Sequence, residues 1–344
     1  MKHSLFAILI LSMATIIFGA KIIVQYEWKY VNFTWDSMTQ MANAVKSGHY
    51  DFTKCLLYDA DKWPHDNRIF VTIPKEAGPG SPATLAIVSN KRGPEGPRLT
   101  PYPDWSWHNC KCNDIHCIVN VHRIHVKCNY IFVLDNGKIG MNQVCNPKLL
   151  VFNLSNNKLV KTIYIPSDLA NNKAGSGWML TPYVHAPKGC SRLLDTMIVN
   201  LFYSAISSKE MYKMRIEDIL KCPNKETANK QTKFVKKLSS QTGPIASDGC
   251  ALMYSDTTAM SIKGMNVCKK DGAGNAVVLA QNSITLQAVS GLKTIVGANT
   301  NKKNDILIAL SDRFQKFAKQ NINFTEINFR YLETKLSEVK KEIN

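Results

Sequence analysis

Short hydrophobic runs, rich in β-branched and aromatic residues and separated by Gly, Pro and Asn, recur along most of the chain. Runs of this length and composition are typical of β-strands bounded by turns. The clearest runs are Ile69–Ile73, Ala83–Val88, Ile131–Leu134, Leu149–Leu154, Leu159–Ile165, Met197–Tyr203, Ala251–Tyr254, Val277–Ala280 and Ile306–Leu310. Many short strands with frequent turns predict an all-β barrel, sandwich or propeller. Roughly 320 residues in one domain favour a propeller over a single sandwich.

The amino-terminal segment breaks this pattern. Residues 1–20 have the form of a secretory signal peptide, because Lys2 precedes the apolar run Leu5–Phe18 and Ala20 is a suitable small residue for cleavage. The run is too short to span a bilayer. We therefore expect a secreted, extracellular protein without membrane insertion, with a single domain over residues 21–330.

The carboxy-terminal segment, residues 331–344, breaks the pattern in another way. Leu332, Leu336 and Val339 recur there at helical spacing, and Lys and Glu occupy most positions between them. We expect this charged tail to form a short exposed helix or a frayed end.

The charge balance is strongly basic. The chain has 43 Lys and Arg against 26 Asp and Glu, a formal net charge of +17. Such a balance is compatible with nucleic acid, an anionic membrane or acidic glycans as partners. The lysines are spread along the chain, however, and their local clusters are pairs such as Lys236-Lys237 and Lys340-Lys341. We therefore expect a solvated surface and no nucleic-acid partner, with anionic surfaces as a secondary alternative.

Cysteines and glycosylation motifs agree with secretion. Ten cysteines in an oxidising compartment favour disulfides over free thiols. Three acceptor motifs for N-glycosylation begin at Asn32, Asn153 and Asn323. The sequence thus predicts a disulfide-bonded glycoprotein.

The densest stretch for cysteine, histidine and aromatic residues is 99–135. Zinc is a possible occupant, since Cys and His are its usual ligands. The spacing disfavours a metal, because Cys110-Lys-Cys112 is too tight for a common ligand pair and no CxxC…HxxxH set is present. We expect no metal there, and instead disulfides together with a strand that carries His122 and His125 on a half-exposed face.

Catalytic motifs are absent from the sequence. There is no GxSxG elbow, HExxH motif or P-loop, and nothing predicts a cofactor. His108 and His122 could act as acid and base near Asp104, since histidine has a suitable pKa. Asp135 ends an apolar run before Asn136-Gly137, where a role in a turn is favoured over that of a base. We expect no catalytic residues.

An ordered set of motifs resembles one family, the insect Yellow and major royal jelly proteins. The motifs are Tyr26–Tyr30 (YEWKY), Arg68–Pro74 (RIFVTIP), Gly80–Leu85 (GSPATL), Leu99–His108 (LTPYPDWSWH), Cys128–Asp135, Cys145–Phe152 (CNPKLLVF), Tyr164–Pro166, Leu201–Tyr212 (LFYSAISSKEMY), Ala280–Gln287 (AQNSITLQ), Ala309–Phe314 (ALSDRF) and Asn328–Arg330 (NFR). They span nearly the whole chain after the leader. The pieces Ala280–Gln287 and Leu310–Phe314 are most similar to the royal jelly branch.

This resemblance implies a six-bladed β-propeller, and it leaves three functions open. Some members of the family bind small amines in the central channel, some are linked to dopachrome conversion in melanin formation, and others are nutritional or salivary secretions. Fold alone does not decide between such functions. We favour a non-catalytic secretory or amine-binding protein. The alternatives are a dopachrome-converting enzyme and a nutritional or degenerate member without a ligand channel.

The chain departs from the family pattern after Cys190. Only ten residues separate Cys190 from Leu201, where the family carries roughly 40 residues more, about one blade. Three explanations are open. The ring closes with fewer blades, one blade of the ring is incomplete, or the sequence comes from an incomplete gene model.

The resemblance also implies particular residues. Asp312 and Phe314 match positions that contact amines, where a carboxylate and an aromatic face would hold a protonated amine. The alternative is that Asp312 caps a turn and Phe314 is core. Cys128 and Cys190 match a disulfide of related propellers, although Cys128 could instead pair locally. Cys268 matches a family cysteine whose partner lies near the carboxy terminus. No cysteine follows Cys268 in this chain, so it pairs with Cys250 or Cys222 or stays free.

Overall fold

The computed structural model describes most of the chain between Ala20 and Asn344. The described residues are 20–109, 114–165, 181–182, 184, 200–203, 209–215, 227, 230–239, 242–269, 276–297 and 304–344. The expected signal peptide and the expected deletion next to Cys190 lie outside them. None of the helices in this described part has the length and apolar character needed to cross a bilayer.

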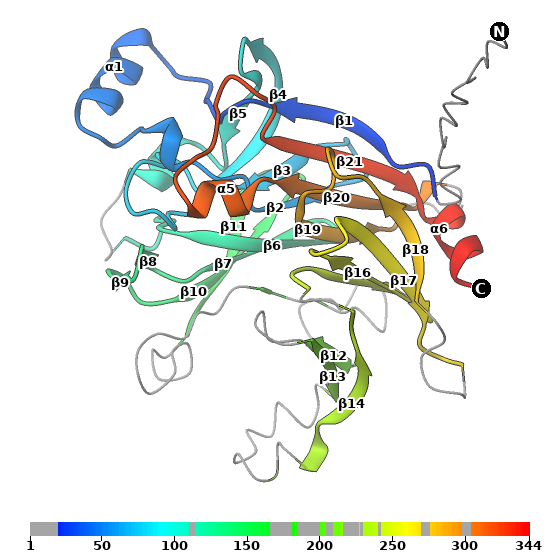
Figure 1. Ribbon diagram of the computed structural model, residues 1–344. Helices are drawn as coiled ribbons and strands as arrows, with labels where there is room; N and C mark the ends of the chain where they lie inside the picture. Colours follow the sequence, from blue (N-terminus) through cyan, green and yellow to red (C-terminus); the bar gives the residue numbers. More distant parts are fainter. Residues whose placement is uncertain are drawn as a thin grey trace, which may run out of the picture.

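Antiparallel sheets of consecutive strands make up the fold (Figure 1). The first two sheets are β2 to β5 (Asp59–Lys62, Ile69–Thr72, Leu85–Gly93, Gly96–Pro101) and β6, β7, β10 and β11 (Val121–Lys127, Tyr130–Asp135, Lys148–Asn153, Lys158–Tyr164). The next two are β12 to β14 (Asn200–Tyr203, Glu210–Arg215, Lys233–Lys237) and β15 to β18 (Ile245–Asp248, Ala251–Asp256, Ser261–Asn266, Val277–Gln281). All of the hydrophobic runs named above lie largely in strands, wherever the structure describes them.

The last sheet joins the two ends of the chain. It consists of β19 (Ala288–Ile295), β20 (Ile306–Asp312), β21 (Phe329–Lys335) and, at its edge, β1 (Ile23–Trp28). β1 runs antiparallel to β21, and Figure 1 shows the two strands side by side although they come from opposite ends of the sequence. A first strand that completes the last sheet ties the ring together and covers an edge that would otherwise be open.

The first strands of neighbouring sheets lie against one another. β2 contacts both β6 and β19, and β19 contacts β15. Four-stranded antiparallel sheets that meet along their first strands form a β-propeller, whose innermost strands surround a central axis. The all-β propeller expected from the sequence is therefore confirmed.

The described residues form five sheets of blade type, four with four strands and one with three. The three-stranded sheet begins with Asn200, directly after the stretch where the sequence predicts a deletion. It packs through Met211 and Leu238 against Leu252 and Met265 of the following sheet. Residues 185–199 lie outside the described part of the chain, so the incomplete or missing blade stays a prediction.

Short helices and one small hairpin lie outside these sheets. Their bounds are α1 (Met38–Lys46), the 3-10 helices Phe52–Lys54 and Trp105–His108, α5 (Phe314–Ala318), α6 (Leu336–Ile343) and the strands β8 (Lys138–Ile139) and β9 (Asn142–Gln143).

The carboxy-terminal tail is more firmly attached than the sequence indicated. The expected domain end at residue 330 falls inside β21, which continues to Lys335. The following helix α6 buries Leu336, Val339 and Ile343 against the last two sheets. These apolar side chains lie on one side of the helix, so burial against the sheets holds it in place instead of leaving it exposed.

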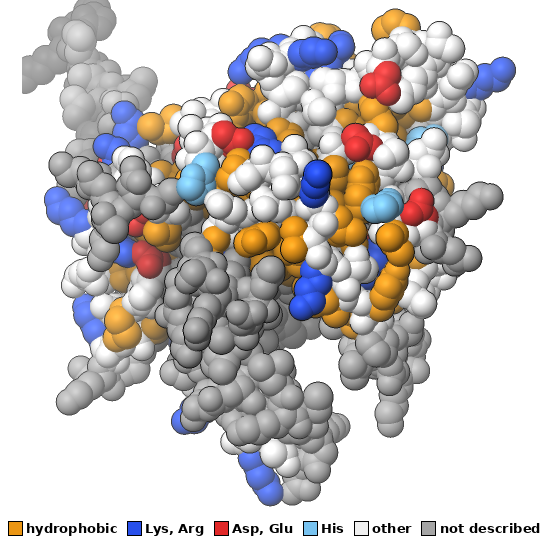
Figure 2. All heavy atoms as spheres, turned by 180° about the vertical axis from the view of Figure 1, so that it is seen from behind, with side chains coloured by type: hydrophobic (Ala, Val, Ile, Leu, Met, Phe, Trp, Pro, Cys, Tyr) orange, Lys and Arg blue, Asp and Glu red, His pale blue; other side chains and the backbone are white. Residues whose placement is uncertain are grey.

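Basic side chains do not gather into a single patch on the face shown in Figure 2. Lys and Arg are scattered there among hydrophobic, acidic and uncharged side chains.

Candidate ligand site at the inner strands

Two buried aspartates of the innermost strand β2 join it to its neighbours. Asp59 and Asp61 alternate with Ala60, so both side chains point to the same face of the strand. Asp59 Oδ2 accepts a hydrogen bond from the backbone N–H of Ile124 at 3.1 Å, and Asp61 Oδ2 accepts one from Val126 at 2.8 Å. Both donors belong to β6. The two carboxylates are almost fully buried, at 0% and 1% exposure, and their bonds connect the first two sheets.

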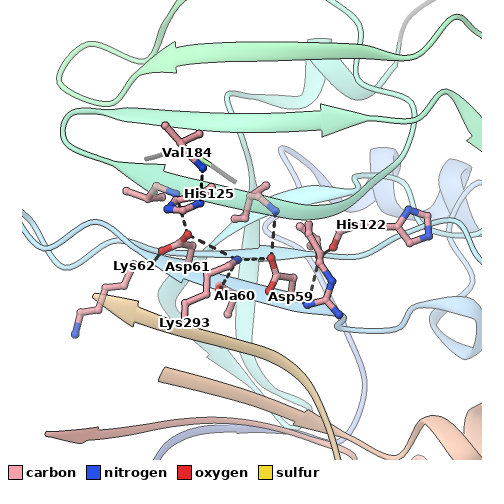
Figure 3. A network of polar contacts seen from close by, with 12 residues as sticks. Asp59, Ala60, Asp61, Lys62, His122, His125, Val184 and Lys293 are labelled. Atoms are coloured by element: carbon pink, nitrogen blue, oxygen red, sulfur yellow. Dashed lines mark hydrogen bonds and ion pairs between the residues drawn. The ribbon is translucent and has the colours of Figure 1, made fainter. Parts of the chain in front are cut away.

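Lys293 of β19 compensates these two charges from the other side. Its Nζ donates to Asp59 Oδ2 and, at 3.1 Å, to the carbonyl oxygen of Ala60, and it lies 3.7 Å from Asp61 Oδ2. Figure 3 shows Lys293 between the two aspartates. Burial raises the pKa of Asp61 to about 6, and the positive charge of Lys293 acts against that rise. Buried charges of this kind are tolerated because they are paired and hydrogen-bonded.

Gly291 allows β19 to come this close to β2. A Cβ atom at this position would lie 3.0 Å from Asp59 Oδ1 and 3.2 Å from the backbone nitrogen of Ala60. A larger residue would therefore push the two strands apart. The strand register also shifts between Val289 and Gly291, which marks a bulge at this point.

Arg123 of β6 adds a second cation beside Asp59. Its Nη1 lies 3.7 Å from Asp59 Oδ1, and its guanidinium carbon lies 5.0 Å from the ring centroid of Tyr58. This is the geometry of a cation–π contact. Asp59 Oδ1 is buried and has no hydrogen-bond partner among the described residues.

Asp312, the last residue of β20, has one bonded and one unbonded oxygen. Its Oδ1 accepts a hydrogen bond from the backbone N–H of Phe314 at 2.8 Å, while Oδ2 is buried with no partner among the described residues. Burial raises the pKa of Asp312 to about 7. The N–H of Phe314, the hydroxyl of Ser290 and the charge of Arg123 act against that rise. We call Asp59, Asp61, Arg123, Lys293 and Asp312 the inner-strand charge cluster.

The two residues expected to form an amine site have different surroundings. Asp312 is 2% exposed and does cap the turn into α5, as one alternative predicted. Phe314 is 42% exposed and is not part of the core, in contrast to that same alternative. The aromatic ring that contacts a cation of the cluster is Tyr58.

Most residues of the inner-strand charge cluster were not predicted from the sequence. The segment Asp59–Lys62 (DADK) resembles a polar loop, and nothing in it marks a buried strand. A pair of acids at alternating positions beside apolar residues is the one signal that could have been used, since Asp is rarely buried without a partner.

The histidines expected as acid and base are each bound elsewhere. His108 Nε2 lies 3.0 Å from the carbonyl oxygen of Tyr102, and Asp104 accepts from the backbone N–H of Ser106. His122 contacts Glu76 Oε2 at 2.6 Å and Asn136 Nδ2 at 3.0 Å. Figure 3 shows His122 turned away from Lys293 and the aspartates. The three residues do not form a joint acid–base site.

His122 in β6 and Asp135 at the end of β7 are both buried. His122 is 2% exposed and not half-exposed, because the register of β6 shifts between Val121 and Ile124 and turns the side chain inward. The expectation was therefore wrong for His122, whereas His125 is half-buried. Asp135 accepts from the backbone N–H groups of Asn120 and Gly137 at 2.9 and 3.0 Å, as expected of a turn residue.

The disulfide expectations are resolved in part. Cys250 and Cys268 form a disulfide, the pairing proposed for Cys268. Cys128 is disulfide-bonded, as are Cys117 and Cys145. The expected partner Cys190 lies outside the described residues, so the Cys128–Cys190 pair stays a prediction. Within the described part, no group of three or more His, Cys, Asp and Glu is arranged to hold a metal ion.

The three glycosylation motifs differ in accessibility. Asn323 is exposed and Asn153 is half-buried. Asn32 is only 6% exposed, and its amide nitrogen donates to Glu95 Oε1 at 2.9 Å. Its amide oxygen accepts from the backbone of Phe33. The Asn32 nitrogen that would carry a glycan is thus enclosed and hydrogen-bonded, whereas Asn323 lies at the surface.

A cavity of about 550 Å³ lies at the opposite end of β2 and β19. Its lining includes Lys62, His65, Ile306 and Glu333, and Lys62 Nζ lies 2.9 Å from Glu333 Oε1. The two charged side chains of the lining are therefore paired with each other. The cavity does not include the inner-strand charge cluster.

Fold and cluster together define a β-propeller with a buried, charged centre. Residues 119–198 and 183–343 match the model of the Major royal jelly protein family, and the chain belongs to this family. It is 28% identical to Major royal jelly protein 9 of Apis mellifera, over 92% of this chain and 88% of the relative. It is 30% identical to Major royal jelly protein 3 of the same species, over 90% and 68%.

The alignment with Major royal jelly protein 9 extends over 388 residues, more than the 344 of this chain. The relative therefore contains segments without a counterpart here, in agreement with an internal deletion.

Similarity to solved structures is weaker. The PQQ-bound aldose sugar dehydrogenase of Streptomyces coelicolor has a TM-score of 0.43 and 8% identity, covering 91% of this chain and 98% of that chain. The nidogen/laminin complex has a TM-score of 0.35 and 11% identity, covering 88% and 91%. Scores of this size do not bear on ligand or function.

Proposed function

We propose that the protein is a secreted, non-catalytic member of its family that binds small cationic ligands of the biogenic-amine type at the inner-strand charge cluster. The observation that carries the proposal is the buried Oδ2 atom of Asp312, which lacks a hydrogen-bond partner among the described residues. An unsatisfied buried acceptor is costly. A ligand N–H group placed against this oxygen would remove the cost, which favours binding.

The surroundings of Asp312 suit a protonated amine with an aromatic body. The partly exposed ring of Phe314 follows two residues later, and the ring of Tyr58 already faces a cation. An ammonium group interacts favourably with both a carboxylate and the face of an aromatic ring. Serotonin and dopamine have this chemistry.

Secretion is supported by the apolar leader and by the disulfide between Cys250 and Cys268. Disulfides persist in oxidising compartments. The non-catalytic role is supported by the different partners of His108, His122 and Asp104 described above.

Calorimetric titration of the secreted protein with serotonin and dopamine tests the proposal. We expect saturable binding that is at least tenfold weaker in Asp312→Asn. Asp36→Asn serves as a matched control, because Asp36 is an exposed aspartate outside the cluster. Failure of the folded wild-type protein to bind either amine would refute the proposal.

Dopachrome conversion is the second candidate. The observation in its favour is the contact between His122 Nε2 and Glu76 Oε2 at 2.6 Å, a pairing that is suited to acid–base chemistry. Turnover above that of a denatured control, lost in His122→Gln, would support this enzyme over the binding protein. A nutritional or degenerate role is the third candidate, motivated by the three-stranded sheet.

A further inference from the structure

The two cations of the inner-strand charge cluster are held in different ways. Lys293 Nζ donates two hydrogen bonds, one of them to Asp59. Arg123 is 9% exposed, yet none of the described residues accepts a hydrogen bond from its guanidinium group, which has five N–H donors. Its contacts are the 3.7 Å approach to Asp59 Oδ1 and the ring of Tyr58. Among the described residues, Arg123 is therefore nearly buried but held only by charge and by ring contact.

Two buried carboxylate oxygens of the inner-strand charge cluster also lack a hydrogen bond from any described residue. Asp59 Oδ1 and Asp312 Oδ2 are both buried and have no hydrogen-bond partner in the described part of the chain. The charge of Arg123 acts on both aspartates, through the ion pair with Asp59 and through its effect on the pKa of Asp312. Cation and carboxylates thus compensate each other's charge without satisfying each other's hydrogen-bonding groups, and a buried acceptor without a hydrogen bond is costly.

We propose that Arg123 is a built-in competitor of the ligand, whose guanidinium group fills the cation position beside Tyr58 and Asp59 until a ligand ammonium group displaces it. This inference rests on the proposed function and adds a regulating residue to the same site. An ammonium group is compact and offers several N–H donors from one point, whereas the guanidinium group is a rigid planar fork. The exchange leaves the charge of the cluster unchanged, because one monovalent cation replaces another.

Displacement of Arg123 has a consequence for affinity. A site that is filled by its own side chain is available only for part of the time, and its apparent affinity falls by that fraction. Removal of the Arg123 charge should therefore strengthen amine binding, opposite to the loss expected from removal of Asp312.

The test compares serotonin binding by wild type, Arg123→Gln and Arg123→Ala in the full secreted protein. We expect the dissociation constant to fall at least tenfold in both variants. Arg92→Gln is the matched control, because Arg92 also lies over an aromatic ring, that of Tyr26 at 5.9 Å, but is exposed and outside the cluster. Unchanged or weaker binding in both Arg123 variants would overturn the inference.

A second measurement separates this inference from the proposed function. Methylguanidinium, added at millimolar concentration, should raise the melting temperature of Arg123→Ala saturably, leave the wild-type value unchanged, and lose its effect in Arg123→Ala/Asp312→Asn. If amines never bind but methylguanidinium shows this pattern, the cation position stands and the proposed amine function fails. If amines bind through Asp312 but methylguanidinium has no effect and the Arg123 variants bind as wild type does, the function stands and the inference fails.

Discussion

Lys293 of β19 donates a hydrogen bond to Asp59 of β2 and so joins the last sheet of the propeller to the first. Asp59 in turn accepts from the backbone of Ile124 in β6. Three neighbouring sheets are therefore connected through one buried carboxylate, at the point where the structure also brings Arg123. The same atoms thus contribute to holding these three sheets together and to the proposed ligand site.

Lys293→Met should destabilise the protein strongly. The substitution leaves Asp59 and Asp61 buried without their cation, and breaking a buried ion pair from one side costs about 3–5 kcal/mol. Urea unfolding followed by circular dichroism measures this loss, with Lys319→Met at an exposed position as the control. A loss below about 1 kcal/mol would mean that the pair behaves like a surface salt bridge and does not hold the sheets together.

Asp312 should make the protein less stable as the pH rises. Its folded-state pKa is raised from 3.8 to about 7, so the folded protein binds the proton more tightly than the unfolded chain does. Stability from this group is fully present below about pH 4 and is lost as the pH rises through 7. At pH 8 the free energy of unfolding, measured with urea, should therefore be about 1–3 kcal/mol higher for Asp312→Asn than for wild type. This difference should shrink at pH 5. A difference independent of pH would contradict the assignment.

His108 should act in the opposite direction. Burial lowers its pKa from 6.5 to about 4, and its Nδ1 atom is buried without a partner among the described residues. A histidine whose pKa is lowered by folding stabilises the folded state at pH values above the pKa of the unfolded chain. That stability is lost as the pH falls from 6.5 towards 4. Between pH 7 and pH 4 the melting temperature should decrease less for His108→Gln than for wild type. The same change at His116, which is exposed, should leave the decrease unaltered.

The three glycosylation motifs should differ in use. We expect a glycan on Asn323, whose side chain is exposed, and none on Asn32, whose amide is buried against Glu95. Peptide mass spectrometry of the secreted protein, with and without glycosidase treatment, measures the occupancy of each site. High occupancy at Asn32 would show that the packing around it is different in the secreted protein.

The strands were predictable from the sequence because their signal is local. Short hydrophobic runs and flanking turn residues place strands such as Ile69–Ile73 and Ile306–Leu310 within a residue or two of β3 and β20. The burial of His122 was not predictable in this way, because a shift of register reverses the side of a strand that a residue faces.

The charge cluster depends on contacts between distant parts of the chain. Asp59 and Lys293 are 234 positions apart, and the packing of β19 against β2 brings them together. Asp312 was found through family resemblance, and its buried free oxygen is visible only in the structure. Arg123 and Tyr58 carry no local signal at all.

The most direct test of the central claim is the pH dependence of serotonin binding, measured by calorimetry in wild type and Asp312→Asn at pH 6 and pH 8. Serotonin stays protonated over this range, so a change in affinity reports on the protein. With the pKa of Asp312 at about 7, the account predicts tighter binding at pH 8 in the wild type and weak, pH-independent binding in the variant. Equal binding by both proteins at both pH values would contradict the claim that the Asp312 carboxylate holds the amine.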